Sequence, residues 1–149
     1  MEAALQKLLP NKETVLVSKD NCAEIYHLPD SNIVYVLMQG LSKNQCYRLN
    51  ADRSLSVLQR FKATCLIMDF SNLMLMSADD QEWIEDVWQK QAVEAGLKQM
   101  AAIMPDNLFA ALSINKLTAN IKRNNSFESA SFMDSSDAYS WLSSSLATS

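Results

Sequence analysis

The side chains that could carry out chemistry are one histidine, three cysteines and a run of carboxylates. His27 is the sole histidine, so a metal site or a Ser-His-Asp triad would have to use it. It stands shortly before Pro29 at the end of a β-rich run, where a histidine is more often a surface or partly buried residue than a catalyst. The carboxylates at 79–86 fit the solvated face of an amphipathic helix better than an acid–base pair poised by burial. We therefore expect a protein that is not an enzyme.

The cysteines and glycines give no sign of a cofactor. Cys22, Cys46 and Cys65 are odd in number and include no CxxC pair, so zinc and redox motifs lack support. Cys65 lies in an apolar strand pattern and is expected to be a small buried core residue. Only two glycines occur, and neither GxGxxG nor GxxxxGK[ST] is present, which excludes phosphate-cradling loops of these two kinds. No cofactor and no metal are expected.

Length and charge narrow the class of protein further. A chain of 149 residues is expected to form one domain with a sizeable core, which we place at 13–146 between an N-terminal extension (1–12) and a short tail (147–149). A net charge of -4 gives no general attraction to nucleic acid or to an anionic membrane. The amino end does not match a signal peptide, and no apolar run approaches membrane-spanning length. We expect a cytoplasmic protein with no nucleic-acid partner and no membrane insertion.

Hydrophobic periodicity predicts the elements that position these residues. The expected strands cover 14–18, 22–28, 33–40, 64–70, 98–104 and 126–133, and the expected helices cover 43–61, 78–95, 106–121 and the segment that follows the caps at 134–136. The turn residues 29–32 predict a hairpin. The helix at 43–61 is expected to be interrupted near 50–52, and Gly96 to end the next helix. The order predicts an α/β fold: an N-terminal β-hairpin followed by βα units, and a central mixed sheet with about four helices.

The junction between the strand at 64–70 and the next helix carries the most unusual composition. Four large apolar residues, Leu73 to Met76, are expected in a loop, and one or two facing outward would form an adaptable patch for a protein partner, a second subunit or a lipid-like ligand. Ser77 is a candidate N-cap, and acidic residues in the first turn suit the helix dipole. The helix is expected to bury Val87 and Trp88. The candidate interaction face consists of Met74, Leu75, Met76, Asp79, Asp80 and Trp83.

The same junction carries a family resemblance. Asp69-Phe70-Ser71 ends the strand, apolar residues follow, and Ser77-Ala78-Asp79-Asp80 opens the helix. This arrangement resembles the STAS domain of bacterial anti-sigma factor antagonists, in which Asp-aliphatic-Ser leads to Asp-Ser-Ser-Gly. Here Ala78 falls at the place of the phosphorylated serine, and the glycine is missing. Ser77 and Ser71 are the candidate phosphoacceptors that remain.

Further motifs are similar to small bacterial proteins related to STAS and to the CRAL-TRIO lipid-transfer domain: DDQEWI at 79–84, EAGLK at 94–98, PDNLF at 105–109 and WL at 141–142. The resemblance implies a regulatory, protein-interaction domain that binds through residues 73–84, as a homodimer. The alternative is a small apolar or lipid-like ligand, held by the same loop and the helix at 107–121. A closed apolar cavity of several hundred Å³ beneath that helix would favour the ligand.

Overall fold

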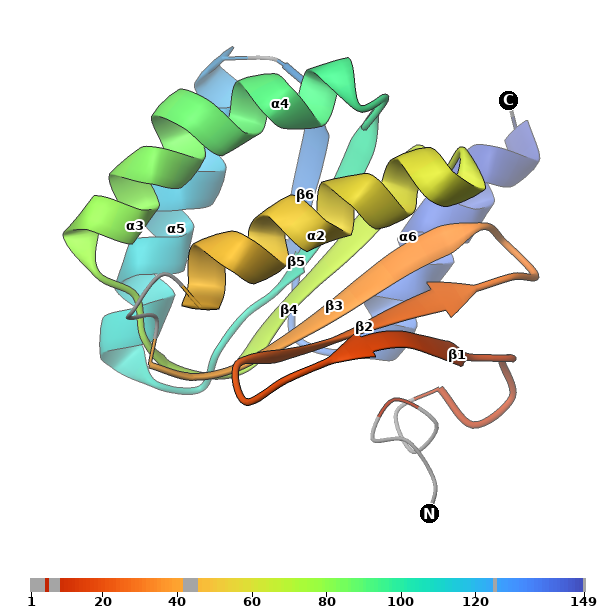
Figure 1. Ribbon diagram of the computed structural model, residues 1–149, viewed down its shortest axis with the longest axis horizontal. Coiled ribbons are helices and arrows are strands. Elements are labelled where there is room, and N and C mark those ends of the chain that lie inside the picture. The colour runs from red at the N-terminus through yellow and green to blue at the C-terminus, as the bar shows by residue number, and fades with distance from the viewer. Residues whose placement is uncertain (1–4, 6–8, 42–45, 125, 149) are drawn as a thin grey trace.

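The computed structural model describes residues 5, 9–41, 46–124 and 126–148. These residues form one six-stranded sheet whose strands lie side by side in sequence order (Figure 1). The strands are β1 (Val15–Lys19), β2 (Ala23–Leu28), β3 (Ile33–Leu41), β4 (Cys65–Leu75), β5 (Gln99–Ile103) and β6 (Glu128–Phe132). The helices are α2 (Cys46–Phe61), α3 (Ala78–Trp83), the π-helical turn η1 (Ile84–Trp88), α4 (Gln89–Glu94), α5 (Leu108–Asn124) and α6 (Ser135–Thr148).

The pairing pattern divides the sheet into two parts. β1, β2 and β3 pair antiparallel, whereas β3 to β6 pair parallel. Each connection between neighbouring parallel strands carries helix: α2, then the continuous α3–η1–α4 segment, then α5. The structure confirms the predicted α/β class, with a β-hairpin followed by βα units and a mixed sheet.

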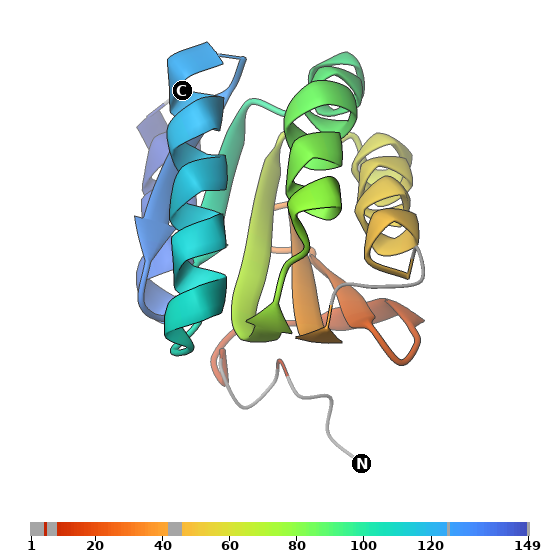
Figure 2. The same ribbon diagram turned by 90° about the vertical axis from the view of Figure 1, so that its left-hand side faces the viewer.

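Two apolar layers cover the two faces of the sheet. α2 lies in front of the strands in Figure 1 and α6 behind them, and Figure 2 shows α5, α3 and α2 side by side. The larger core cluster joins the sheet to α2, to the α3–η1–α4 segment and to α5, and contains Trp88, Phe70 and Leu58. The smaller cluster joins the other face to α6 and includes Leu5 and Leu9, from the predicted N-terminal extension. No described helix is long and apolar enough to cross a membrane.

The hairpin turn explains the only histidine. Asn32 has a positive φ of 52°, a conformation that asparagine tolerates at turns. His27 is buried, donates from Nε2 to the Asn32 side-chain oxygen over 2.8 Å, and stacks on Phe61 at a ring distance of 3.8 Å. The Asn32 amide in turn donates to the Phe61 carbonyl oxygen. These contacts of His27 and Asn32 therefore hold the β2–β3 hairpin against the end of α2.

Three local predictions need correction. α2 runs from Cys46 to Phe61 without the predicted interruption, and residues 43–45 of that predicted helix lie outside the described residues. β4 continues to Leu75, five residues beyond the predicted strand end, because β3 extends to Leu41 and offers it backbone partners. Val87 was predicted to be buried, but 39% of it is exposed.

The π-helical turn accounts for Val87. The Gln89 amide donates to the Ile84 carbonyl five residues back, so this turn contains an extra residue. The insertion shifts the apolar stripe, leaving Ile84 and Trp88 buried and turning Val87 outward. α4 ends at Glu94, and Gly96 follows as the C′ residue, as predicted. Gly96 has a φ of 100°, and its amide and that of Leu97 form a Schellman motif.

Candidate functional site

The end of β4 carries exposed apolar side chains. Met74 and Leu75 are 58% and 48% exposed, whereas Leu73 and Met76 are buried. Alternation along a strand places successive residues on opposite faces, and the bulge in the β3–β4 pairing near Leu41 shifts this alternation at the tip. Two of the four residues face outward, within the number that the sequence predicted, while Met76 of the predicted face is covered.

α3 begins directly after this strand end. The Ser77 side chain accepts a hydrogen bond from the Asp80 amide over 3.1 Å, which makes Ser77 the N-cap that the sequence predicted. Asp79 is exposed, but Asp80 is buried and its carboxylate accepts from Arg48 Nε over 2.8 Å. Asp80 is therefore placed to support the predicted face from beneath rather than to contact a partner.

Arg48 also reaches the aromatic residue of this face. Its guanidinium lies 5.6 Å from the centre of the half-buried Trp83 ring, within the range of a cation–π contact. One side chain on α2 thus binds both a carboxylate and an indole on α3. The first turn of α2 consequently sets the position of the start of α3.

The first turns of α5 add exposed apolar residues that are not part of the predicted interaction face. Leu108, Phe109 and Leu112 are 68%, 71% and 57% exposed. The α5 residues that are buried recur at Ala110, Ile114, Leu117, Thr118 and Ile121. At about 100° per residue, Leu108 and Leu112 lie roughly opposite that stripe. A helical wheel of 108–121 separates the exposed row from the buried row.

We call Met74, Leu75, Leu108, Phe109 and Leu112 the apolar edge. Met74 and Leu75 are the last residues of β4, and the other three come after the carboxyl end of the neighbouring parallel strand β5, so all five belong to the same edge of the sheet (Figure 1). Ligands and partners of open α/β sheets commonly bind at this edge. Large apolar side chains gathered on a surface indicate a contact site more strongly than single exposed ones do.

An open groove of about 450 Å³ lies between α3 and α5, beside the apolar edge. It is lined by Met76, Ala78 and Gln81 on one side and by Leu112, Ser113 and Lys116 on the other. At one end, Glu85 of η1 accepts hydrogen bonds from Gln81 and from Asn120 of α5. These bonds hold the two helices at a fixed distance.

The space beneath these helices is filled. A void lined by Met68, Phe70, Trp88 and Leu117, among others, has a volume of about 10 Å³, room for about one water molecule. The Trp88 indole closes this region, donating its Nε1 hydrogen to the Ala51 carbonyl oxygen over 2.9 Å. The void is far smaller than the several hundred Å³ of a ligand pocket.

The candidate phosphoacceptors both lie near the strand end. The Ser77 hydroxyl already serves as a cap, and the Ser71 amide donates to the Asp69 carboxylate over 2.9 Å. The other oxygen of buried Asp69 accepts a hydrogen bond from Tyr35. Burial, followed by the neighbouring carboxylate, raises the pKa of Tyr35 well above its usual 10.0, so its hydroxyl stays protonated. Phosphorylation of either serine stays a prediction.

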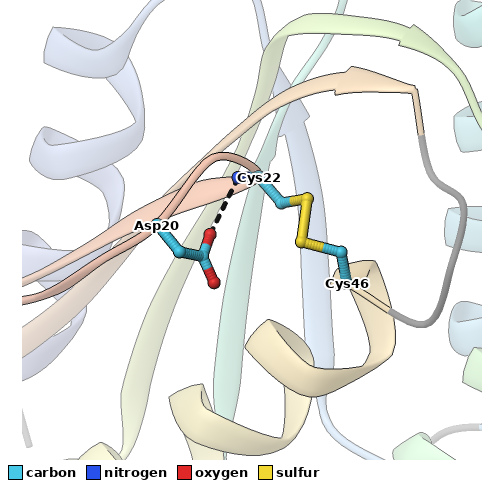
Figure 3. A group of neighbouring side chains, drawn as sticks. All are labelled: Asp20, Cys22 and Cys46. Atoms are coloured by element: carbon cyan, nitrogen blue, oxygen red, sulfur yellow. Dashed lines mark hydrogen bonds between the residues drawn. A yellow bond between two sulfur atoms is a disulfide. The ribbon is translucent and has the colours of Figure 1, made fainter.

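One cluster has the residue types of a metal site. The ligand atoms of Asp20, Cys22 and Cys46 lie within 4.8 Å of one another, but the two cysteines form a disulfide (Figure 3). Disulfide sulfurs are not the thiolate ligands that zinc prefers. The sequence analysis missed this bond because 24 residues separate its partners. Cys65, by contrast, is free and buried, as expected, and burial raises the pKa of its thiol.

Comparison with known proteins adds a set of structural likenesses. No family model matches the chain, and no curated protein sequence matches it significantly. An anti-sigma factor antagonist from Mycobacterium paratuberculosis is 12% identical over 87% of this chain and 92% of its own, with a TM-score of 0.48. Apo-SiaC from Pseudomonas aeruginosa is 13% identical over 80% and 98%, with a TM-score of 0.48. A second structure of SiaC from Pseudomonas aeruginosa is 12% identical over 80% of this chain and 99% of its own, with a TM-score of 0.46.

The first of these proteins is an anti-sigma factor antagonist, the class of protein that the sequence motifs resemble.

Proposed function

We propose that the protein is a non-enzymatic, regulatory interaction domain that binds a protein partner through the apolar edge and the start of α3. The observation that carries the proposal is the exposure of five large apolar side chains, two at the carboxyl end of β4 and three in the first turns of α5, the helix that follows β5. A partner that covers this apolar area stabilises the complex by about 25 cal/mol for each Å² that it removes from water. Binding, unlike catalysis, requires no poised acid or base.

We propose a second copy of the chain as that partner. The surface offers a projection and a groove side by side: Phe109 is 71% exposed on α5, and the groove between α3 and α5 lies one turn further along the same helix. A two-fold axis brings each projection to the other copy's groove, which makes the surface self-complementary. Leu112, which is exposed, supplies an apolar contact within the groove.

Acidic side chains surround this surface. Asp79, Glu82 and Asp106 are exposed close to the starts of α3 and α5. Charges at the rim of an interface orient the partners and add little affinity. In this proposal the apolar edge supplies the binding energy, and Lys116, exposed at the groove, is the cation that an acidic rim of the second copy would face.

The filled space beneath the helices favours contact over ligand storage. A lipid-like ligand would need a cavity of several hundred Å³ beneath α5, where the void measures about 10 Å³. The groove between α3 and α5 is open to solvent and suits a protruding side chain of a partner. The apolar-ligand alternative would therefore require these helices to separate.

The test is sedimentation velocity over a concentration series with matched variants. Phe109→Ser removes the projection, and because the residue is exposed, the free energy of unfolding should change by no more than about 0.5 kcal/mol. We expect a dimer for the unchanged chain, and at least a tenfold weaker dimer for Phe109→Ser, since interface anchors contribute about 2 kcal/mol or more.

Val93→Ser is the matched control, because Val93 is an exposed apolar residue on α4 that lies outside the apolar edge. It should leave the association unchanged. A monomer at every concentration would overturn the homodimer. A photo-crosslinker at position 109, compared with one at position 93 in the native host, then tests for a different partner protein; equal labelling from both positions would refute the apolar edge as the contact site.

A further inference from the structure

The Cys22–Cys46 disulfide joins two structural elements at a point where both can be reached from solvent. Cys22 immediately precedes β2 and Cys46 is the first residue of α2, with a Cα–Cα distance of 6.1 Å, which lies in the usual range for a disulfide (Figure 3). Both residues are half-buried, whereas Cys65 is buried. An external thiol can therefore reach the pair and not the third cysteine.

A second, non-covalent tie joins the same two elements. The Asp20 carboxylate accepts from the amides of Cys22 and Ala23 over 2.8 and 3.0 Å, and from the side chains of Asn50 and Arg53 over 3.0 and 2.9 Å. Asn50 and Arg53 lie on the second and third turns of α2. We expect these bonds to keep α2 docked on the β1–β2 turn when the disulfide opens, so that the two sulfurs remain close enough to form the bond again.

We propose that Cys22 and Cys46 form a reversible thiol–disulfide site that controls the first turn of α2, and through it the start of α3. The link is Arg48, two residues after Cys46, which holds Asp80 at 2.8 Å and lies over Trp83. Opening the disulfide releases the covalent anchor of this turn. The effect on partner binding rests on the proposed function, whereas the redox chemistry and the loosening do not.

The exchange requires a dithiol as the two-electron reductant. One thiolate of the dithiol attacks Sγ of Cys22, the bond between the two protein sulfurs breaks, and Cys46 leaves as a thiolate. The amino end of α2 is the positive end of the helix dipole and stabilises that leaving thiolate. The second thiol of the dithiol then attacks the mixed disulfide and releases Cys22. The dithiol becomes a disulfide, and the protein gains two electrons and two protons.

The same cluster is less suited to a metal ion in the reduced state. Both Asp20 oxygens already accept hydrogen bonds, and one of them pairs with the Arg53 guanidinium. A bound cation would have to displace this arginine from the carboxylate. The hydrogen bonds of Asp20 therefore hold Cys22 and Cys46 close together, and do not prepare a metal site.

The first experiment counts reactive thiols in the folded chain. After incubation with 1,4-dithiothreitol, or in its oxidised form, the protein is alkylated without denaturant and the labelled positions are identified by mass spectrometry. We expect Cys22 and Cys46 to be labelled only after reduction, Cys65 in neither state, and reoxidation to restore the bond. Cysteines that stay joined until the protein unfolds, or that never join, would overturn the proposal.

The second experiment measures the structural effect. Reduction opens a loop with a sequence separation of 24 residues, for which we expect a fall of about 10 °C in Tm. Hydrogen exchange should rise at least several-fold at 50–52 and 80–83, whose amides donate hydrogen bonds to the first turns of α2 and α3, and should stay unchanged in β5. Cys22→Ser should reproduce the reduced state in oxidising buffer, while Cys65→Ser should keep the response to reductant. Equal exchange in both redox states at 50–52 and 80–83 would refute the coupling.

The third experiment tests the thiol–disulfide site and the apolar edge independently of each other. Sedimentation of the oxidised and reduced chain should show at least a threefold weaker self-association on reduction. If the thiol count and the exchange respond as expected while the chain is a monomer in both states, the redox site holds and the homodimer fails. If a dimer forms with equal affinity in both states, the apolar edge holds and its control by the disulfide fails.

Discussion

Arg48 on α2 donates its Nε hydrogen to the buried carboxylate of Asp80 on α3 over 2.8 Å, across 32 residues of sequence. The contact joins two helices whose starts lie behind the apolar edge. Arg48→Ala leaves Asp80 buried without its cation, so we expect the free energy of unfolding in urea to fall by about 1–3 kcal/mol.

Arg60→Ala is the matched control for this substitution. Arg60 lies near the end of the same helix, is exposed and contacts only the face of the Phe61 ring among the interactions described for it. Its loss should change stability by less than about 0.5 kcal/mol. A double-mutant cycle between positions 48 and 80 should give a coupling of at least about 0.5 kcal/mol. Additive effects would show that the pair contributes nothing.

The Ser77 hydroxyl is expected to stabilise the start of α3 through its bond to the Asp80 amide. Removing it in Ser77→Ala should lower the free energy of unfolding by about 0.5–2 kcal/mol, the usual contribution of an N-cap. Ser77→Asn is the control, because asparagine also caps helices and, like alanine, lacks a phosphoacceptor hydroxyl. Urea denaturation should give the order Ser ≈ Asn > Ala. Equal losses for alanine and asparagine would contradict the capping role.

The element order was predictable because its signals are local. Serine before a run of acidic residues marked the start of α3, and Gly96 marked the end of α4. The apolar run of β4 and the alternation of strands with helical patterns were enough to predict a mixed sheet. These features depend on residues close together in sequence, where propensity and periodicity apply.

The site was less predictable because it depends on distant residues. Leu75 belongs to a strand only because Leu41 pairs with it, and Val87 is exposed only because a π-helical turn intervenes. The Cys22–Cys46 bond requires that β2 and the start of α2 meet in space. The exposure of Leu108 was within reach of the sequence, since its spacing from the buried residues of α5 places it on the opposite side.

Asp20 should make stability depend on pH in the acid range. Burial raises the pKa of Asp20, but the amides of Cys22 and Ala23, the Asn50 side chain and the charge of Arg53 outweigh burial and lower it below the usual 3.8. A carboxyl whose folded pKa is lowered stabilises the fold when ionised. This stabilisation is complete above about pH 5 and is lost as the pH falls through 3.8 towards the folded value.

Asp20→Asn tests this linkage by urea denaturation between pH 2 and pH 7. The substitution should lower stability most at neutral pH, and the difference from the unchanged chain should shrink towards pH 2. Asp137→Asn, at an exposed position in the first turn of α6, is the control for a general loss of negative charge. A difference that stays constant across the range would show that ionised Asp20 does not stabilise the fold.

The hydrogen bond from the Tyr35 hydroxyl to Asp69 tests how much a buried polar contact inside the sheet stabilises the fold. Both residues are buried, and burial, together with the carboxylate, raises the pKa of Tyr35, which therefore remains a hydrogen-bond donor. Tyr35→Phe deprives one Asp69 oxygen of this donor in a place that water does not reach. We expect a loss of about 1–3 kcal/mol in the free energy of unfolding, measured in urea at pH 7.

Tyr139→Phe provides the comparison, because it removes the same atom from another buried tyrosine. Its hydroxyl contacts Ser31 over 2.5 Å, and Ser31 is half-buried, so the serine can turn to water when its partner is removed. The loss should be smaller than for Tyr35→Phe. Equal losses at pH 7 would mean that the buried carboxylate gains no more from its tyrosine than a serine does.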